Sequence, residues 1–310
     1  MLPATHGPIV LDGGLATELA NRGFDLSDTL WSARLLVDAP EAIEAVHRAY
    51  FEAGADIAIT ASYQASFEGF AKRGFTHRDT ERLLQLSVTL ARNARDHIEA
   101  NTPASTRPRW IAASVGPYGA TLHDGSEYRG DYGLDEDALT AFHRPRIKAL
   151  LGAGPDLLAC ETLPSLLEAR AILRVLREFP EARAWMTFTC RDGASTSAGD
   201  AIAECARTLD AEPQVVAMGV NCVDPVLVTS LVRTMASITG KPIVVYPNSG
   251  EVWNAATHCW EGTATRFTAH LSEWLDAGAS WVGGCCRTTP EDIRIVRAVL
   301  DAARQQHASR

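Results

Sequence analysis

Short apolar segments alternate with longer segments of helical periodicity along the whole chain, and this alternation constrains the fold most strongly. The apolar segments have few polar residues, which is typical of parallel strands that are buried on both faces. Eight strand–helix units in 310 residues predict an α/β fold, a single-domain (β/α)₈ barrel of the TIM type over residues 1–310. The eight predicted strands span residues 9–12, 56–60, 110–114, 156–160, 184–189, 215–220, 243–246 and 281–283.

A doubly wound open sheet is the alternative fold, and the sequence favours it less. The segment after the first predicted strand reads Asp12-Gly-Gly-Leu, which lacks the Gly-x-Gly-x-x-Gly pattern of a dinucleotide site. Three helix starts are also predicted, one of them at Thr289-Pro290, which puts a cap residue before a proline. Ser165-Leu-Leu-Glu168 has the spacing of a capping box, and Asp224-Pro225 puts a cap residue before a proline at the first helical position.

The composition argues against several classes of partner and location. A formal net charge of −9 disfavours nucleic acids and anionic membranes, which both require concentrated positive charge. No apolar run of about 18 residues occurs, so no membrane-spanning helix is expected. The first residues do not have the basic segment and following apolar segment of a secretory signal, and the seven cysteines are scattered along the chain. We therefore expect reduced thiols and a cytoplasmic protein.

Polar side chains follow the predicted strands at the positions where a barrel carries its active site. The carboxyl ends of all eight strands meet at one end of such a barrel. Only three of the 29 basic residues are lysines (Lys72, Lys148 and Lys241), and none of them follows a strand directly, which argues against a Schiff-base mechanism. The residues that do follow a strand are Asp12, 60–64, Glu161, Asn221, Cys222, 246–248, Cys285 and Cys286.

Three cysteines stand out among these residues. Cys222 follows the sixth predicted strand, and the adjacent Cys285 and Cys286 follow the eighth, so their thiols can converge. Adjacent cysteines rarely bond to each other. Three thiolates favour zinc, with copper(I) or an iron–sulfur cluster as alternatives, although a cluster usually needs four cysteines. A three-ligand zinc site keeps one position open, as catalytic sites do. The alternative is that these cysteines are small buried hydrophobic residues.

At these cysteines the sequence resembles a known family. Gly219-Val-Asn-Cys222 and Gly283-Gly-Cys-Cys-Arg-Thr-Thr-Pro290 resemble the zinc motifs of homocysteine S-methyltransferases. The resemblance is greatest to the branch that uses S-methylmethionine or S-adenosylmethionine. Betaine-using relatives have an additional C-terminal arm and cobalamin-dependent methionine synthases have further domains, and we expect neither extension here. The resemblance continues through residues 11–14, 60–64, 115–119, 124–132, 161–165 and 246–251.

This resemblance implies a zinc-dependent transfer of a methyl group from a sulfonium donor to the thiolate of L-homocysteine, which forms methionine. It implies Cys222, Cys285 and Cys286 as zinc ligands, with the homocysteine sulfur as the fourth ligand. It also implies that Asp12 and Glu161 bind the amino group of homocysteine. The competing interpretations are a helix-terminus charge for Glu161 and a turn-forming role for Asp12.

Further positions are expected to bind the two substrates. Ser62 and the amide groups around it are candidates for the homocysteine carboxylate, and Asn221 for orienting the zinc loop or the donor. The family usually has a Ser-Asp-Gly-Thr-like stretch where this chain has residues 197–200, so that loop bears on donor preference. Aromatic faces stabilise a sulfonium cation. The candidates for that contact are Tyr63, Tyr118, Tyr128 and Trp253.

Two other functions are weighed against this one. The first is methyl transfer to a different thiol or to a selenol. The second is a non-enzymatic protein that buffers zinc or thiols. Asp12 and Glu161 on the same barrel face argue against the second, because a metal store needs no ammonium receptor. Among donors, S-methylmethionine is expected to be used above S-adenosylmethionine, and betaine is expected to be inactive.

Overall fold

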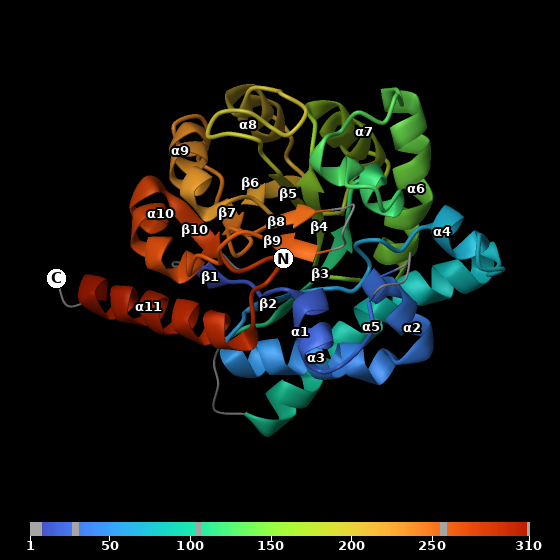
Figure 1. Ribbon diagram of the computed structural model, residues 1–310, viewed down its shortest axis with the longest axis horizontal. Coiled ribbons are helices and arrows are strands. Elements are labelled where there is room, and N and C mark those ends of the chain that lie inside the picture. The colour runs from blue at the N-terminus through green and yellow to red at the C-terminus, as the bar shows by residue number, and fades with distance from the viewer. Residues whose placement is uncertain (1–7, 27–30, 103–106, 255–258, 309–310) are drawn as a thin grey trace.

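The computed structural model describes residues 8–26, 31–102, 107–254 and 259–308. Eight parallel strands lie at the centre of the molecule, and helices surround them (Figure 1). The order of the strands in this sheet is β1-β10-β7-β6-β5-β4-β3-β2. These strands are β1 (Ile9–Val10), β2 (Ile57–Ile59), β3 (Trp110–Val115), β4 (Leu157–Leu163), β5 (Ala184–Phe188), β6 (Val215–Asn221), β7 (Ile243–Tyr246) and β10 (Ala279–Val282).

The sheet closes on itself between its first and second strands. A parallel bridge pairs Leu11 with Ile57. The Asp56 N–H donates to the Val10 carbonyl at 2.7 Å, and the Asp12 N–H donates to the Ile57 carbonyl at 3.0 Å. On the other side β1 pairs in parallel with β10. The prediction of a TIM-type barrel is therefore confirmed, and each predicted strand overlaps an observed one.

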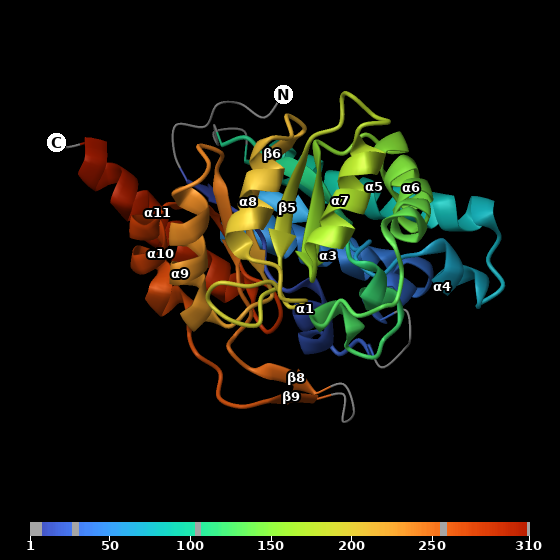
Figure 2. The same ribbon diagram turned by 90° about the horizontal axis from the view of Figure 1, so that it is seen from above.

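At least one helix follows each barrel strand, and these helices cover the outer face of the barrel (Figure 1). An antiparallel hairpin of β8 (Val252–Asn254) and β9 (Cys259–Glu261), which was not predicted from the sequence, lies between β7 and the next helix. Figure 2 shows this hairpin at the end of the barrel to which the strands point. The covering helices are α3 (Pro40–Ala53), α5 (His77–Asn101), α6 (Glu136–Gly152), α7 (Leu166–Leu176), α8 (Ile202–Asp210), α9 (Pro225–Ala236), α10 (Leu271–Ala277) and α11 (Pro290–Ala308).

The strands bury side chains on both faces, which explains their unbroken apolar runs. Alternate residues of a strand point to opposite faces, so one set fills the barrel and the other packs against the helices. The set inside the barrel is Ile9, Leu11, Ile57, Trp110, Ala112, Leu157, Ala159, Trp185, Ala217, Val244, Tyr246 and Trp281.

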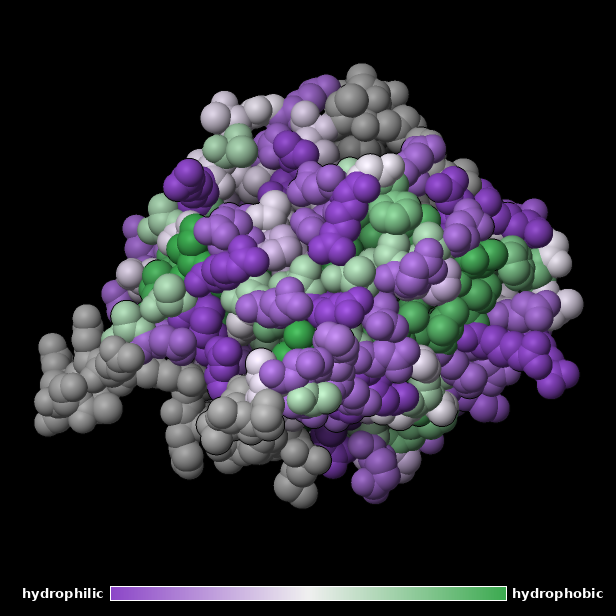
Figure 3. Space-filling view, turned by 90° about the horizontal axis from the view of Figure 1, so that it is seen from below, coloured by the Kyte–Doolittle hydropathy of each residue, from purple (hydrophilic) through white to green (hydrophobic). Residues whose placement is uncertain are grey.

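In Figure 3, hydrophilic side chains cover most of the visible face and apolar ones gather in separate patches. No helix within the described residues is long and apolar enough to cross a membrane.

The three predicted helix starts have different outcomes, and α11 begins at Pro290 as predicted. The Asp224 side chain accepts a hydrogen bond from the Val226 N–H at 3.0 Å, and Pro225 begins α9, as predicted. Ser165 caps α7 by accepting from the Glu168 N–H at 3.2 Å, but the reciprocal half of the capping box is absent. The buried Glu168 carboxylate instead accepts from the backbone N–H of Tyr118 at 2.6 Å. A tertiary contact has thus replaced the local one.

Candidate metal centre

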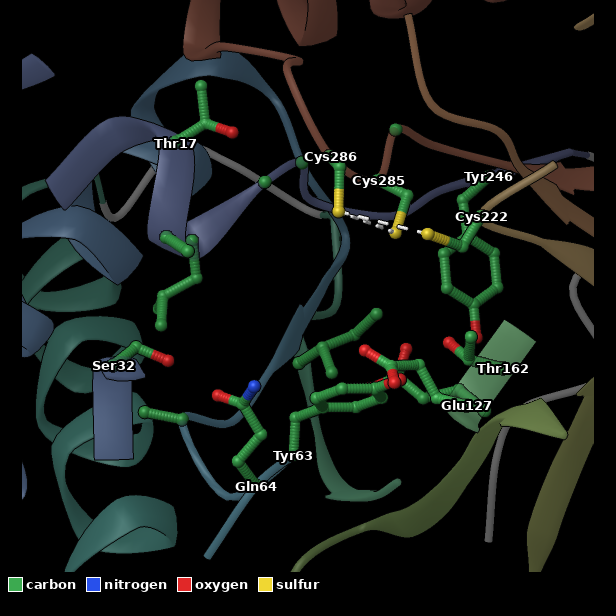
Figure 4. Close-up of a pocket in the computed structure, with 18 of the residues that line it drawn as sticks. Thr17, Ser32, Tyr63, Gln64, Glu127, Thr162, Cys222, Tyr246, Cys285 and Cys286 are labelled. Atoms are coloured by element: carbon green, nitrogen blue, oxygen red, sulfur yellow. Dashed lines mark hydrogen bonds between the residues drawn. The ribbon is translucent and has the colours of Figure 1, made fainter. Parts of the chain in front are cut away.

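The three predicted cysteine ligands converge at the carboxyl end of the barrel. Cys222 directly follows β6, and Cys285 and Cys286 follow β10. The Sγ atoms of Cys222 and Cys286 are 3.7 Å apart, and those of Cys285 and Cys286 are 3.9 Å apart. All three sulfur atoms lie within 4.8 Å of one another and face one another in Figure 4. Three thiols at this spacing can bind one metal ion.

Small residues and one threonine hold the Cys285–Cys286 turn against the loop that follows β1. Thr288 Oγ1 accepts from the Gly14 N–H at 3.1 Å and donates to the Cys285 carbonyl at 2.7 Å. A Cβ atom on Gly14 would lie 2.6 Å from the Cys285 carbonyl oxygen, and one on Gly284 would lie 2.3 Å from Thr288 Oγ1. Glycine is therefore required at both positions for the cysteine turn to approach this closely.

The cluster favours a thiolate even before a metal is considered. Hydrogen bonds from Cys285 and Cys286, with a third from Tyr128, hold the pKa of the Cys222 thiol well below its usual value, although burial opposes this. The Tyr128 hydroxyl lies 3.3 Å from Cys222 Sγ. Burial keeps the pKa of Tyr128 well above its usual value, so this hydroxyl stays protonated and donates to the sulfur. The site therefore stabilises an electron-rich sulfur.

A pocket opens beside the three thiols. The loops that follow β1, β2, β3, β6 and β10 line it, together with residues within β2, β4 and β7 (Figure 4). Thr17 and Ser32 lie on one side of this pocket, and Tyr63 and Gln64 lie across from the sulfur atoms. Its other lining residues include Glu127, Tyr128, Glu161, Thr162, Cys222, Tyr246, Cys285 and Cys286.

Glu161 lines this pocket from within β4, five residues before α7 begins at Leu166. The interpretation as a helix-terminus charge is therefore wrong. The Ser114 hydroxyl donates to Glu161 Oε1. Burial raises the pKa of Glu161 to about 7, although hydrogen bonds from Ser114 and Tyr246 oppose that rise. A buried carboxyl group that no described basic residue pairs with can serve as a receptor for a cation.

Asp12 is buried directly behind the pocket wall, of which Gly13 and Gly14 form a part. Its Oδ2 accepts from the Ile59 N–H at 2.8 Å, which links the loop after β1 to β2. Within the described residues its Oδ1 has no partner. Burial, with repulsion from Glu161 as a smaller cause, raises the pKa of Asp12 well above its usual value. The two carboxyl groups thus share one electrostatic environment.

Asn221 orients the backbone beside Glu161 rather than lining the pocket. Its Oδ1 accepts from the Thr162 N–H and from the Thr187 hydroxyl, both at 2.7 Å, and its Nδ2 donates to Thr162 Oγ1 at 2.7 Å. Thr162 has a φ of 58°, and Cys222 one of 50°. Left-handed backbone is costly for residues other than glycine, especially β-branched ones, and it clusters at functional sites. Asn221 therefore supports two strained residues at the pocket.

Two further predicted binding residues, like Asp12 and Asn221, do not line the pocket. Ser62 is fully buried, and its hydroxyl donates to the Ser114 carbonyl at 2.8 Å and lies 2.7 Å from Thr60 Oγ1. Tyr118 turns its ring toward Tyr132, with ring centroids 5.3 Å apart. Their substrate contacts stay predictions that this geometry does not support. Tyr63 and Tyr128 do line the pocket, whereas the side chain of Trp253 lies outside what the structure describes.

Glu127 is a pocket residue that the sequence reasoning missed. It lies in a short 3₁₀ helix, η3 (Ser126–Tyr128), in the long connection after β3. Its side chain is buried, and its Oε2 has no hydrogen-bond partner among the described residues. Burial raises the pKa of Glu127 to about 7, and the negative charge of Cys222 contributes to this rise. The only sequence signal was its place within the 124–132 motif.

The loop at residues 197–200, where this chain departs from the family pattern, does not line the pocket. Asp200 Oδ2 accepts from the N–H of Leu166, the first residue of α7, at 2.7 Å, and it also accepts from the Thr196 hydroxyl at 3.1 Å. The Ala198 N–H donates to the Pro164 carbonyl at 2.9 Å. This loop therefore stabilises the start of α7, and the departure does not act on the pocket directly.

A fully buried arginine on α6 fixes the loop that carries Tyr63. The Arg146 guanidinium donates to the carbonyls of Ala65 at 2.8 Å, Gly116 at 2.9 Å, Tyr63 at 3.0 Å and Ser62 at 3.4 Å. These carbonyls belong to the connections that follow the neighbouring strands β2 and β3. One cation thus joins two loops of the active-site end.

Replacing Arg146 with methionine is expected to lower the free energy of unfolding by about 3 kcal/mol, because several buried carbonyl groups lose their donor at once. Urea unfolding of the purified variant measures this change. Arg144→Met is the control on the same helix: Arg144 and its partner Glu178 are both exposed, so little change is expected. Equal stabilities of the two variants would contradict the role given to Arg146.

Comparison with known proteins identifies the family. A model of the homocysteine S-methyltransferase family matches residues 9–300. The chain is 51% identical over 299 residues to homocysteine S-methyltransferase YbgG of Bacillus subtilis, and this alignment covers 95% of each chain. It is 48% identical over 294 residues to the homocysteine S-methyltransferase of Escherichia coli, and this alignment covers 94% of each chain.

The fold agrees with a solved structure of the same family. The metallated form of the homocysteine methyltransferase MmuM from Escherichia coli superposes with a TM-score of 0.87 at 46% identity, over 95% of this chain and 97% of that chain. The three converging thiols lie at the end of the barrel where such an enzyme binds its substrates. The chain therefore belongs to the homocysteine S-methyltransferase family and is an enzyme that transfers a methyl group to homocysteine, forming methionine.

Proposed function

We propose that this enzyme uses zinc, held by Cys222, Cys285 and Cys286, and a sulfonium methyl donor, with S-methylmethionine preferred to S-adenosylmethionine. The observation that carries the proposal is the convergence of three thiols within 4.8 Å at the wall of a pocket. Thiolate ligands select soft or borderline metals. Within the described residues no fourth cysteine joins the cluster, which disfavours an iron–sulfur centre.

When bound, zinc would supply positive charge and an open ligand position that lower the pKa of the homocysteine thiol, so that the thiolate forms near neutral pH. Tyr128 would donate its hydrogen bond to Cys222 throughout. Because the cysteine cluster is anionic, the thiolate would stay electron-rich and suited to alkylation. These thiols must remain reduced, and we accordingly infer a cytoplasmic location.

Homocysteine would bind with its ammonium group against Glu161, supported by the charge of Asp12. Both carboxyl groups are buried, and no arginine or lysine pairs with them in the described part of the chain. An ammonium would supply the missing cation and relieve their repulsion. Ser114 holds the Glu161 carboxylate and Asn221 holds the backbone that follows it, so the receptor is preorganised.

The reaction is a displacement at the methyl carbon. The homocysteine sulfur contributes an electron pair to a new C–S bond, and the old C–S bond breaks with its pair left on the donor sulfur. The thiolate and the sulfonium both lose their charges, and the products are two neutral thioethers. The thiol proton has left for solvent beforehand. No general acid is needed, so positioning and the activated nucleophile supply the rate.

The donor preference is tested by measuring methionine formation from homocysteine with one donor at a time. We expect the highest kcat/KM with S-methylmethionine, a lower value with S-adenosylmethionine, and no turnover with betaine. The motivation is the likeness to the S-methylmethionine and S-adenosylmethionine branch over the whole chain. Efficient turnover with betaine as the only donor would overturn the proposal of a sulfonium donor.

A further inference from the structure

The pocket contains a second buried carboxylate, and homocysteine does not account for it. Glu127 is 6% exposed, and its Oε2 has no hydrogen-bond partner within the described residues. No ion pair joins it to a described basic residue. Arg129, the nearest basic residue in the sequence, pairs with Asp131 at 3.2 Å and lies 3.9 Å from Asp124 instead. A carboxyl group buried in this way stays ionised at neutral pH only when a cation from elsewhere pairs with it, and otherwise takes up a proton.

The local backbone holds Glu127 toward the pocket. Gly125 begins the turn with a φ of 77°, and Asp124 Oδ1 accepts from the Ser126 N–H at 2.9 Å. Figure 4 shows the Glu127 side chain across the pocket from the three sulfur atoms. The next residue, Tyr128, reaches Cys222 Sγ with its hydroxyl at 3.3 Å. Glu127 and Tyr128 therefore both face the pocket that the methyl donor must enter to reach the nucleophile.

The charges of the proposed complex leave this carboxylate unpaired. Three thiolates and one divalent metal sum to −1, and the homocysteine thiolate makes this −2. The homocysteine ammonium is assigned to Glu161 and Asp12, so it cannot also neutralise Glu127. The methyl donor is the one reactant that brings a further positive charge into the pocket.

We propose that Glu127 is the counter-ion of the donor's sulfonium group, with the rings of Tyr63 and Tyr128 in the same pocket completing a receptor for that cation. This inference rests on the proposed sulfonium donor. A sulfonium has no N–H or O–H to donate, so it is recognised through its charge and through aromatic faces. Glu127 is then a specificity residue for the donor, whereas Glu161 serves the acceptor.

The chemistry predicts which kinetic constant Glu127 controls. The sulfonium charge disappears as the methyl group moves, so a carboxylate stabilises the bound donor more than the transition state. Loss of the carboxylate should raise the donor KM without lowering kcat. A residue that only maintained the fold would instead lower kcat and thermal stability together.

The test is Glu127→Gln in the metal-loaded enzyme. We expect the KM for S-methylmethionine to rise about 10- to 100-fold, with kcat unchanged or higher and the homocysteine KM unchanged. Glu127→Asp keeps the charge and should retain most of the donor affinity. Asp131→Asn removes the same charge from the exposed part of the same connection, where the side chain is 70% exposed, and should change neither constant. An unchanged donor KM in Glu127→Gln, or a selective rise in the homocysteine KM, overturns the proposal.

A second sulfonium compound shows whether Glu127 contacts the sulfonium group of the donor or its ammonium group. 3-Dimethylsulfoniopropionate carries a sulfonium but no ammonium, and its binding is measured as competitive inhibition or by calorimetry. Glu127→Gln should weaken its binding as much as that of S-methylmethionine, whereas an effect on S-methylmethionine alone would mean that Glu127 holds the ammonium. Calorimetry needs no turnover. A wild-type enzyme that binds neither sulfonium would refute the proposed donor, and one that binds both equally well with and without Glu127 would refute only this inference.

Discussion

Loss of methyl transfer with retention of the barrel is the expected result of replacing Cys286 with alanine. Cys286 is the thiol that the other two both approach, at 3.7 Å for Cys222 and 3.9 Å for Cys285. Its removal leaves two thiols, which bind a metal far more weakly than three. Burial of the barrel interior and of the helix faces supplies most of the stability, so the fold should remain.

Three measurements on one preparation decide this outcome: metal content by elemental analysis, methionine formation, and thermal unfolding by circular dichroism. We expect one zinc per chain in the wild type, and almost none in Cys286→Ala, with activity below detection and a cooperative unfolding transition. Cys205→Ala is the matched control, because Cys205 is a buried cysteine on α8 outside the cluster. Full zinc and full activity in Cys286→Ala would refute the ligand assignment.

The barrel could be predicted because its signal is periodic and repeated. Each strand is buried on both faces, so its apolar run stands out from the amphipathic helices on either side. The β8–β9 hairpin was missed because each strand has only three residues and neither forms an apolar run. The assignment of residues 1–310 to a single domain stays a prediction.

The positions of site residues along the strands could be predicted, but the directions of their side chains could not. A residue in the carboxyl-terminal part of a barrel strand, or directly after it, lies at the active-site end, which sufficed for Glu161 and for the three cysteines. Ser62 lies at that end too, yet internal hydrogen bonds occupy its hydroxyl. Glu127 comes from a long connection that folds back over the pocket, and no local pattern specifies that return. Tertiary packing decides both cases.

The Glu161→Gln variant is expected to lose about 10- to 150-fold in apparent affinity for homocysteine. The amide keeps the shape of the carboxyl group and can still meet the Ser114 hydroxyl, but it carries no charge for the ammonium. A charge-assisted hydrogen bond contributes on the order of 1.5–3 kcal/mol, which corresponds to that range. Donor KM and zinc content should change little, because neither depends on this carboxylate.

Asp12 supplies the control within the same receptor. If both carboxyl groups serve one ammonium, then Asp12→Asn and Glu161→Gln act on the same interaction, and the double variant should lose less affinity than the sum of the two single losses. Independent, additive losses would mean that the two groups contact different parts of the substrate. An unchanged homocysteine KM in Glu161→Gln would remove Glu161 from the receptor altogether.

The pH dependence gives this prediction its sharpest form. Burial raises the pKa of Glu161 to about 7, so its ionised form predominates above that pH and its neutral form below it. Only the ionised form attracts an ammonium, so the part of homocysteine affinity that Glu161 supplies should disappear as the pH falls through about 7. Ionisation of the homocysteine thiol also favours binding at higher pH, but that contribution is common to both proteins. The homocysteine KM of Glu161→Gln, divided by that of the wild type, should therefore be smaller at pH 6 than at pH 8. The same ratio at both pH values would show that the Glu161 charge does not bind the substrate.

The raised pKa also means that the ionised carboxylate opposes folding above pH 7, so the variant should unfold at an equal or higher temperature than the wild type at pH 8.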